Sequence, residues 1–196
     1  MNNTAGIIGN NAGSTGNATV SGASAVWHNS GNLTVGSSGS GTLTISSAQL
    51  YSGGTLVGGG GLTLTTGASA GSGSITFSNG TTFTLGGSSV FIGPSLSVAA
   101  DATVTMNSGS LANGYSGSIS SADDNATFII AGPVSMDGQN LKQFQGFTGT
   151  VQINSGAQLR FSKTTGVNNG GDFTTFVVNG TLNTRNGGAV ACGALN

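Results

Sequence analysis

The chain contains no glutamate, a single cysteine and few charged side chains of either sign. Four basic and five acidic residues give a formal net charge of -1, so the basic surface that binds nucleic acid or an anionic membrane is missing. The one cysteine, Cys192, cannot form a disulfide within the chain, and stability has to come from backbone hydrogen bonds and a core. We expect Cys192 to be a buried, inert thiol, because the nearest basic residue in sequence is Arg185.

Long hydrophobic runs are also missing. No segment has the roughly 20 consecutive apolar residues of a membrane-spanning helix, and the first residues lack the basic and apolar regions of a signal peptide. Gly or Asn interrupts every apolar run before the period of an amphipathic helix could develop. The sequence therefore predicts almost no helix and no insertion of this segment into a membrane.

The chain is rich in glycine, with 37 residues, and in apolar residues that alternate with Thr or Ser. Short strands of this alternation, closed by Gly, Ser or Asn, recur from end to end, which is typical of a solenoid whose units bury their apolar faces by stacking. The unbroken repeat predicts one domain over residues 1–196. Because the repeat is already running at Ile7 and still running at Val190, we expect the chain to be a fragment of a longer protein.

Apolar residues two positions apart identify the buried face of each strand. They are Leu33 and Val35, Leu43 and Ile45, Leu62 and Leu64, Ile75 and Phe77, Phe83 and Leu85, Val104 and Met106, Val151 and Ile153, and Leu159 and Phe161. An antiparallel sandwich would also contain many short strands, but the strands resemble one another and few junctions are the Asn-Gly pairs of tight hairpins. The sequence predicts an all-β, right-handed parallel β-helix (β-solenoid) of about eight coils, with the hand that parallel crossovers usually take.

One wall of this β-helix is expected to stack a column of large apolar residues, with one coil missing from the series. The column is Leu43, Leu62, Val104, Phe128, Val151 and Phe173. Two segments break the pattern, residues 120–125 and 137–146, and both are expected to project from the rod as loops or bulged corners. Phe144 would then lie in a projecting loop.

Two stretches carry a recognisable repeat. The first covers about residues 8–58 and contains Ala25-Val26-Trp27-His28-Asn29-Ser30-Gly31-Asn32-Leu33-Thr34-Val35-Gly36 and Ser40-Gly41-Thr42-Leu43-Thr44-Ile45. The second runs from Phe147 to Phe161 and is followed by Leu182-Asn183-Thr184-Arg185-Asn186-Gly187-Gly188. Together they resemble the repeats of autotransporter (type V secretion) passengers and related bacterial surface repeat proteins, over about half of the chain. The resemblance implies a right-handed β-helix exported to or through the bacterial outer membrane and displayed outside the cell. The repeats of this family are structural, so the resemblance assigns no catalytic residue. We predict a structural or adhesive module without catalysis of its own, with glycans or host and other cell surfaces as partners.

A polysaccharide-active β-helix enzyme, a lyase or a glycosidase, is the main alternative. Such enzymes use clustered carboxylates with a basic neighbour or calcium, and Asp123 and Asp124 are the only adjacent acidic residues. If a corner of the β-helix brings them close to Lys142 or Lys163, acid–base chemistry becomes feasible. The simpler interpretation is a turn, because two Asp residues followed by Asn125 are typical of one.

The other residues that could bind a ligand or take part in catalysis have structural interpretations. His28 is the sole histidine, so it cannot form a multi-histidine metal site and is expected on the surface. Trp27 is expected to pack in the core or at an edge rather than to stack on a sugar, and so are Tyr51 and Tyr115. The glycine run at residues 58–61 precedes a strand and has no following Lys, so it is not a phosphate-binding loop. We predict no cofactor and no metal.

The neutral Thr, Ser and Asn surface raises two further alternatives. Thr-x-Thr pairs recur about 20 residues apart and would form flat ice-binding rows if they stacked in one wall without interruption; they are Thr42/Thr44, Thr63/Thr65, Thr82/Thr84 and Thr103/Thr105. Against this, the strands at 74–77 and 95–98 lack the pair. The ends of a solenoid also expose strand edges, which favours self-association.

Overall fold

The computed structural model describes residues 1–65, 67–70, 73–86, 95–110, 117–136, 144, 146–161 and 175–184. These residues form 18 strands in two sheets, and none of them belongs to a helix long and apolar enough to cross a membrane. The first sheet contains β1 (Asn2–Asn3), β2 (Gly6–Ile8), β4 (Val26–Val35), β6 (Gln49–Val57), β8 (Ile75–Phe77), β10 (Leu96–Val98) and β12 (Ile119–Ser121). The second contains β3 (Thr15–Ser21), β5 (Ser40–Ser46), β7 (Gly60–Thr65), β9 (Thr81–Gly86), β11 (Thr103–Ser110), β13 (Thr127–Ile130), β14 (Pro133–Met136), β15 (Thr150–Ile153), β16 (Gln158–Phe161), β17 (Thr175–Val178) and β18 (Thr181–Thr184).

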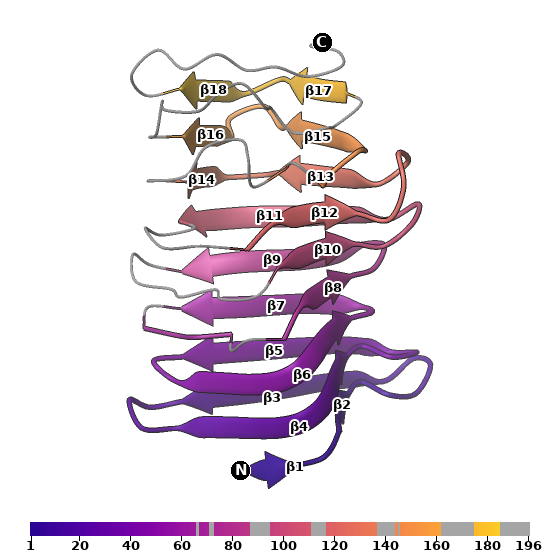
Figure 1. The fold of residues 1–196 in the computed structure, drawn as a ribbon, viewed down its shortest axis with the longest axis vertical. Helices are drawn as coiled ribbons and strands as arrows, with labels where there is room; N and C mark the ends of the chain where they lie inside the picture. Colours follow the sequence, from indigo (N-terminus) through magenta and orange to yellow (C-terminus); the bar gives the residue numbers. More distant parts are fainter. Residues whose placement is uncertain are drawn as a thin grey trace.

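The chain winds as a parallel β-solenoid, which confirms the predicted fold class. Every pairing between the described strands is parallel and joins a strand to its counterpart one turn away, in the paths β1-β4-β6-β8-β10-β12 and β3-β5-β7-β9-β11-β13-β15-β17. As the chain climbs from the N-terminus, β4 and β6 run rightward in front and β5 and β7 run leftward behind, so the winding is right-handed (Figure 1). The described part makes about six turns, slightly fewer than the expected eight coils.

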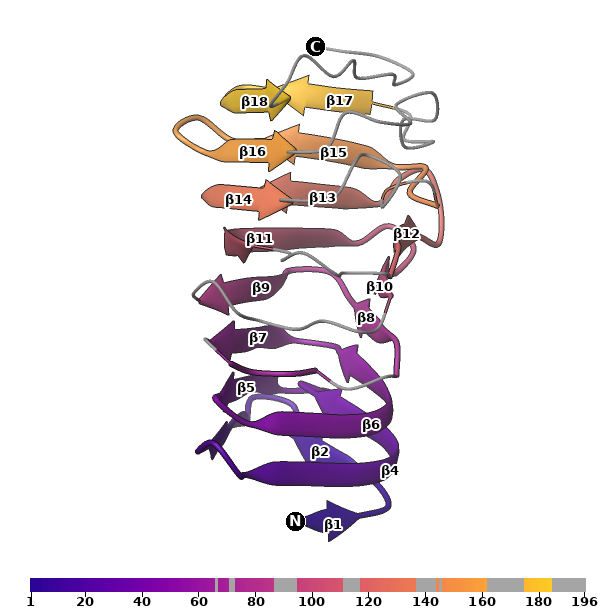
Figure 2. The same ribbon diagram turned by 60° about the vertical axis from the view of Figure 1, so that its left-hand side comes forward.

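The later turns have an additional wall. Strand β11 is continuous over eight residues, and its last residues Gly109 and Ser110 pair with Val134 and Ser135 of β14. Above β11 the same stretch of each turn is divided into two strands, so β14, β16 and β18 stack beside β13, β15 and β17 (Figure 2). The cross-section of the solenoid therefore changes along its length.

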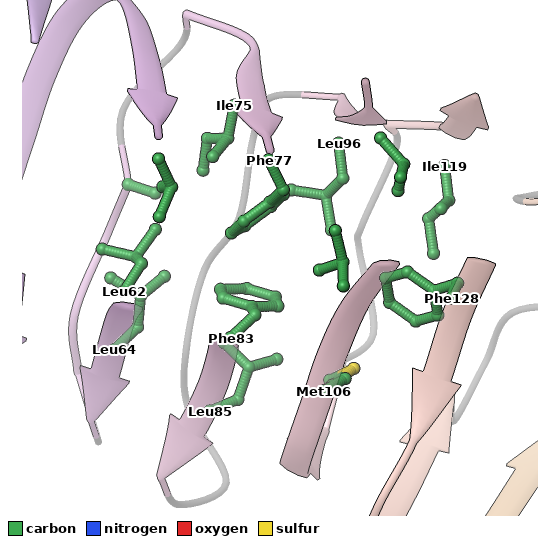
Figure 3. Close-up of a cluster of buried hydrophobic side chains, with 14 of the residues drawn as sticks. Leu62, Leu64, Ile75, Phe77, Phe83, Leu85, Leu96, Met106, Ile119 and Phe128 are labelled. Carbon is green, nitrogen blue, oxygen red and sulfur yellow. The ribbon is translucent and has the colours of Figure 1, made fainter. Parts of the chain in front are cut away.

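The core fills the space between the sheets with the residues that the two-residue period selects. Strands β5, β8, β10 and β15 alternate buried apolar side chains with half-exposed Thr, Ser or Gln. Phe77 from β8 and Phe83 from β9 approach from opposite walls, with ring centroids 5.2 Å apart (Figure 3). Leu33, Leu43, Phe128 and most other core residues are fully buried. The predicted inward faces are confirmed wherever the side chains are described.

The apolar column of the second sheet differs from the expectation at two places. Leu62 pairs with Phe83, which fills the coil that the predicted series left out. Phe83 in turn pairs with Met106, whereas the prediction placed Val104 in this column. At the other end Val151 pairs with Phe176, whereas Phe173 lies outside the described residues. The prediction of Phe173 is therefore wrong by three positions, because the lengths of the corners vary from turn to turn.

The two segments expected to project also differ from the prediction. Residues 119–121 form β12, so only the turn at 122–126 leaves the sheet. Phe144 is buried and packs edge-on against Phe128 and Phe147, with centroids 5.9 Å and 6.1 Å away. It is a core residue and not a residue of a projecting loop. The rest of 137–145 lies outside the described residues.

Candidate functional site

The corner between β12 and β13 holds the two adjacent acidic residues. Asp123 is half-buried, and its Oδ1 accepts hydrogen bonds from the backbone N–H groups of Asn125 (3.2 Å) and Ala126 (3.0 Å). Its Oδ2 accepts one from the backbone N–H of Asp101, at 3.1 Å, in the turn below. These bonds close the turn and tie it to its neighbour. The carboxylate of Asp123 is therefore occupied by backbone donors, which supports the turn interpretation.

Neighbouring corners use the same device. The side-chain amide of Asn125 donates to Asp101 Oδ1 at 2.9 Å, and Asn79 Oδ1 accepts from the backbone N–H of Thr103 at 3.0 Å. Asp101 itself has a φ of 54°, the left-handed conformation that Asp and Asn tolerate better than most residues. Asn and Asp side chains thus join the corners of successive turns by hydrogen bonds to the backbone and to each other.

The remaining parts of the catalytic hypothesis are not assembled in the described structure. Asp124 is exposed, and Lys142 and Lys163 lie outside the described residues. Within the described part, no group of three or more His, Cys, Asp or Glu side chains is placed to hold a metal ion. Cys192 and Tyr115 also lie outside the described residues.

Trp27 has the structural role that the sequence predicts. Its side chain is 8% exposed, and its Nε1 donates a hydrogen bond of 2.6 Å to Asn3 Oδ1 in β1. The neighbouring His28 is exposed on β4, as expected. The glycine run 58–61 leads into β7 and not into a helix, in agreement with the rejection of a phosphate-binding loop.

The outer face of the second sheet carries a column of threonines. Thr19, Thr44, Thr63 and Thr84 pair in register across β3, β5, β7 and β9, and we call these four residues the threonine column. The next column is interrupted, because Thr42 pairs with Gly61 before the series continues at Thr82. The Thr-x-Thr pairs are thus offset by two residues instead of stacking pair on pair.

The strands that lacked the Thr-x-Thr pair do not interrupt this surface. Both β8 and β10, which contain residues 75–77 and 96–98, belong to the first sheet. The sequence argument against a continuous threonine row therefore does not apply to the wall in which the threonines lie. Single-sequence spacing had no means of assigning a strand to one wall or the other.

The N-terminal end of the solenoid exposes a strand edge and part of the core. Strand β3 is the last in its path and is paired only with β5 among the described strands. An apolar hollow of about 340 Å³ opens there, lined by residues that include Ala18, Val20, Val26 and Trp27. Self-association through such an end stays a prediction.

Charge is distributed very unevenly along the rod. All four basic and all five acidic side chains lie at position 101 or later, so the turns built from residues 1–100 carry none. A charge-free surface cannot attract an ionic ligand by steering and favours neutral partners.

These features define a class of protein: a right-handed parallel β-solenoid with a largely neutral outer surface and corners joined by hydrogen bonds of Asp and Asn side chains. No protein-family model, curated protein or solved structure matches the chain, so the class is described from its own structure.

Proposed function

We propose that the chain is a structural and adhesive module of a bacterial surface or secreted protein, an extended rod that presents a neutral binding surface outside the cell. The observation that supports this most directly is the uninterrupted parallel stack whose outward residues are mostly Thr, Ser and Asn. Because each turn repeats a similar short unit, a solenoid of this kind builds a long surface from a simple sequence. The resemblance of residues 8–58 to passenger repeats supports the extracellular location.

The catalytic alternative is weaker than the adhesive one. Asp123 uses both carboxylate oxygens to accept backbone N–H groups, which leaves it poorly placed to take a proton from a substrate. Among the described residues Asp124, its exposed neighbour, belongs to no group of three or more His, Cys, Asp or Glu side chains that could hold a calcium ion.

The test is a binding screen against a glycan array and a panel of cell surfaces, with release of reducing sugar measured on the same glycans. The adhesive rod predicts binding without release, and the double variant Asp123→Ala/Asp124→Ala should bind as the parent does. Sugar release that disappears in the double variant would establish the enzyme instead. A chain that attaches to none of these surfaces would contradict the adhesive proposal.

Ice binding is a second candidate, and the threonine column is the observation that favours it. Four threonines in register, at the strand spacing of about 4.8 Å, present hydroxyl and methyl groups as a regular row. Gly61 leaves a gap in the neighbouring column, which makes the row narrow. Ice binding predicts thermal hysteresis that is lost in Thr44→Lys and Thr63→Lys and kept in Ser97→Lys, on the outward face of β10 in the first sheet. Absence of hysteresis in the parent protein would exclude it.

A further inference from the structure

A polar hollow lies on the outer face of the first sheet, on the side of the solenoid that the threonine column does not share. Its volume is about 310 Å³, and strands β4 and β6 and the start of β8 line it. The lining residues are Asn32, Thr34, Gly53, Gly54, Thr55, Leu56, Ser74 and Thr76. A volume near 300 Å³ is at the lower end of ligand pockets and suits a small ligand.

The hollow exists because two features coincide in β4 and β6. The register between the strands shifts between Asn29 and Asn32, and Asn29 holds the bulge by donating from its Nδ2 to Gly31 O at 2.8 Å. Above Asn32 the chain has Gly53 and Gly54, which put no side chain on the outer face. The missing side chains leave a depression whose floor is backbone.

Four polar side chains surround this floor. Asn32 and Ser74 are exposed and Thr34 and Thr76 are half-buried, and none of the four forms a side-chain hydrogen bond to another described residue. They therefore offer hydroxyl and amide groups to a ligand. Leu56, which pairs with Thr34 on one side and Thr76 on the other, is 39% exposed and adds an apolar wall.

The chemistry of the lining selects the ligand. No charged side chain occurs in residues 1–100, so an anionic or cationic group bound here would lose its hydration without gaining an ion pair. A ligand that presents several hydroxyls and an apolar ring face can satisfy both the four polar side chains and Leu56. Neutral sugars have this combination without a charge, whereas uronic acids and phosphorylated sugars add an anionic group that the lining cannot pair.

We propose that this hollow is a binding site for a neutral sugar unit, and that it provides the adhesive contact of the rod. The inference rests on the adhesive function proposed above and adds the place and the ligand class. Asn32 and Ser74 would exchange hydrogen bonds with sugar hydroxyls, and the sugar ring would lie over Gly54 with one face against Leu56.

Two variants test the site directly. Gly54→Val fills the depression: a Cβ at this position meets Ser74 O at 3.7 Å and Asn32 Oδ1 at 3.3 Å, a close contact that the exposed Asn32 side chain relieves by a small shift, and the rest of the valine occupies the hollow. Asn32→Ala removes a polar group at an exposed position, where the change should leave the fold intact. It therefore tests the site even if Gly54→Val fails to fold. Thr44→Val, on the outer face of the second sheet, is the matched control.

The experiment is a glycan array with neutral and acidic sugars, followed by titration of the best neutral glycan at low and high salt. We expect binding to neutral glycans that salt leaves unchanged, because no ion pair contributes. Gly54→Val should weaken the affinity about tenfold or more, Asn32→Ala about fivefold, and Thr44→Val should match the parent. Circular dichroism of each variant identifies any loss of affinity that comes from misfolding.

Three results would overturn the inference. Binding confined to acidic glycans would contradict the neutral lining, and full binding by both hollow variants would place the contact elsewhere. Attachment to cell surfaces without binding to any free neutral glycan would also reject the hollow, while the adhesive function would stand. A chain that binds neither glycans nor cells would reject the adhesive function itself.

Discussion

Replacing Phe128 with Ala should destabilise the middle of the solenoid strongly. The Phe128 side chain is fully buried, and its ring packs edge-on against Phe144 and Phe147, with centroids 5.9 Å and 6.3 Å away. Truncating a buried Phe to Ala costs about 3–5 kcal/mol, and the two edge-on contacts place this site in the upper part of that range. Against a typical domain stability of about 5–15 kcal/mol, such a loss is a large fraction of the total.

Urea unfolding followed by two probes measures the loss of stability and how far along the solenoid this loss extends. Far-UV circular dichroism reports on all strands, whereas the fluorescence of the only tryptophan, Trp27, reports on the first turns. Because each strand pairs only with the turns directly above and below, we expect the dichroism transition to move to lower urea and the Trp27 transition to move less. Thr127→Ala, on the outward face of the same strand, is the control and should stay within about 0.5 kcal/mol of the parent.

Two results would refute this reasoning. A loss below about 1 kcal/mol for Phe128→Ala, comparable with Thr127→Ala, would mean that the three phenylalanines do not form a packed core. An equal shift at both probes would mean that the solenoid unfolds as one unit and that destabilisation spreads beyond neighbouring turns.

Three further changes have defined outcomes in the same unfolding assay. Asp123→Ala should cost about 1–3 kcal/mol because three backbone N–H groups lose their acceptor, whereas Asp124→Ala should stay within about 0.5 kcal/mol; equal effects would contradict the turn interpretation. Gly36→Ala should cost several times more than Gly80→Ala: both have φ near +70°, at 71° and 72°, but only at Gly36 would a Cβ collide with the backbone of the next turn. Trp27→Phe should lose about 1 kcal/mol with its indole hydrogen bond and speed amide exchange in β1; unchanged exchange there would show that the bond does not hold this strand.

The strand faces could be predicted from the sequence because the two-residue period is a local property. Leu33 and Val35, or Phe83 and Leu85, are buried because alternate side chains of a strand point to the same face. Parallel stacking also followed from the similarity of successive units. These inferences need no knowledge of which turn lies above which.

The assignment of strands to walls could not be predicted with the same accuracy. Corners differ in length, so a spacing of about 20 residues does not show whether Phe173 or Phe176 stacks on Val151. Phe144 has no alternating neighbours, and its burial depends on Phe128 from another turn. The candidate sugar site was missed for a similar reason: Asn32 and Ser74 come from different turns, and only the pair Gly53-Gly54 at an outward position marks the hollow locally.

The register of the second sheet has a consequence for how the protein can change in length. Thr103, Thr127, Thr150 and Thr175 pair in sequence on successive strands, so each is the starting position of one turn. Removing residues 127–149 would bring Thr150 to the place of Thr127 and leave every later pairing intact, whereas removing one or three residues from within a strand would turn the apolar side chains beyond the deletion outward. Duplication and deletion of whole turns are thus the tolerated genetic events, and the length of the rod changes in steps of one strand spacing.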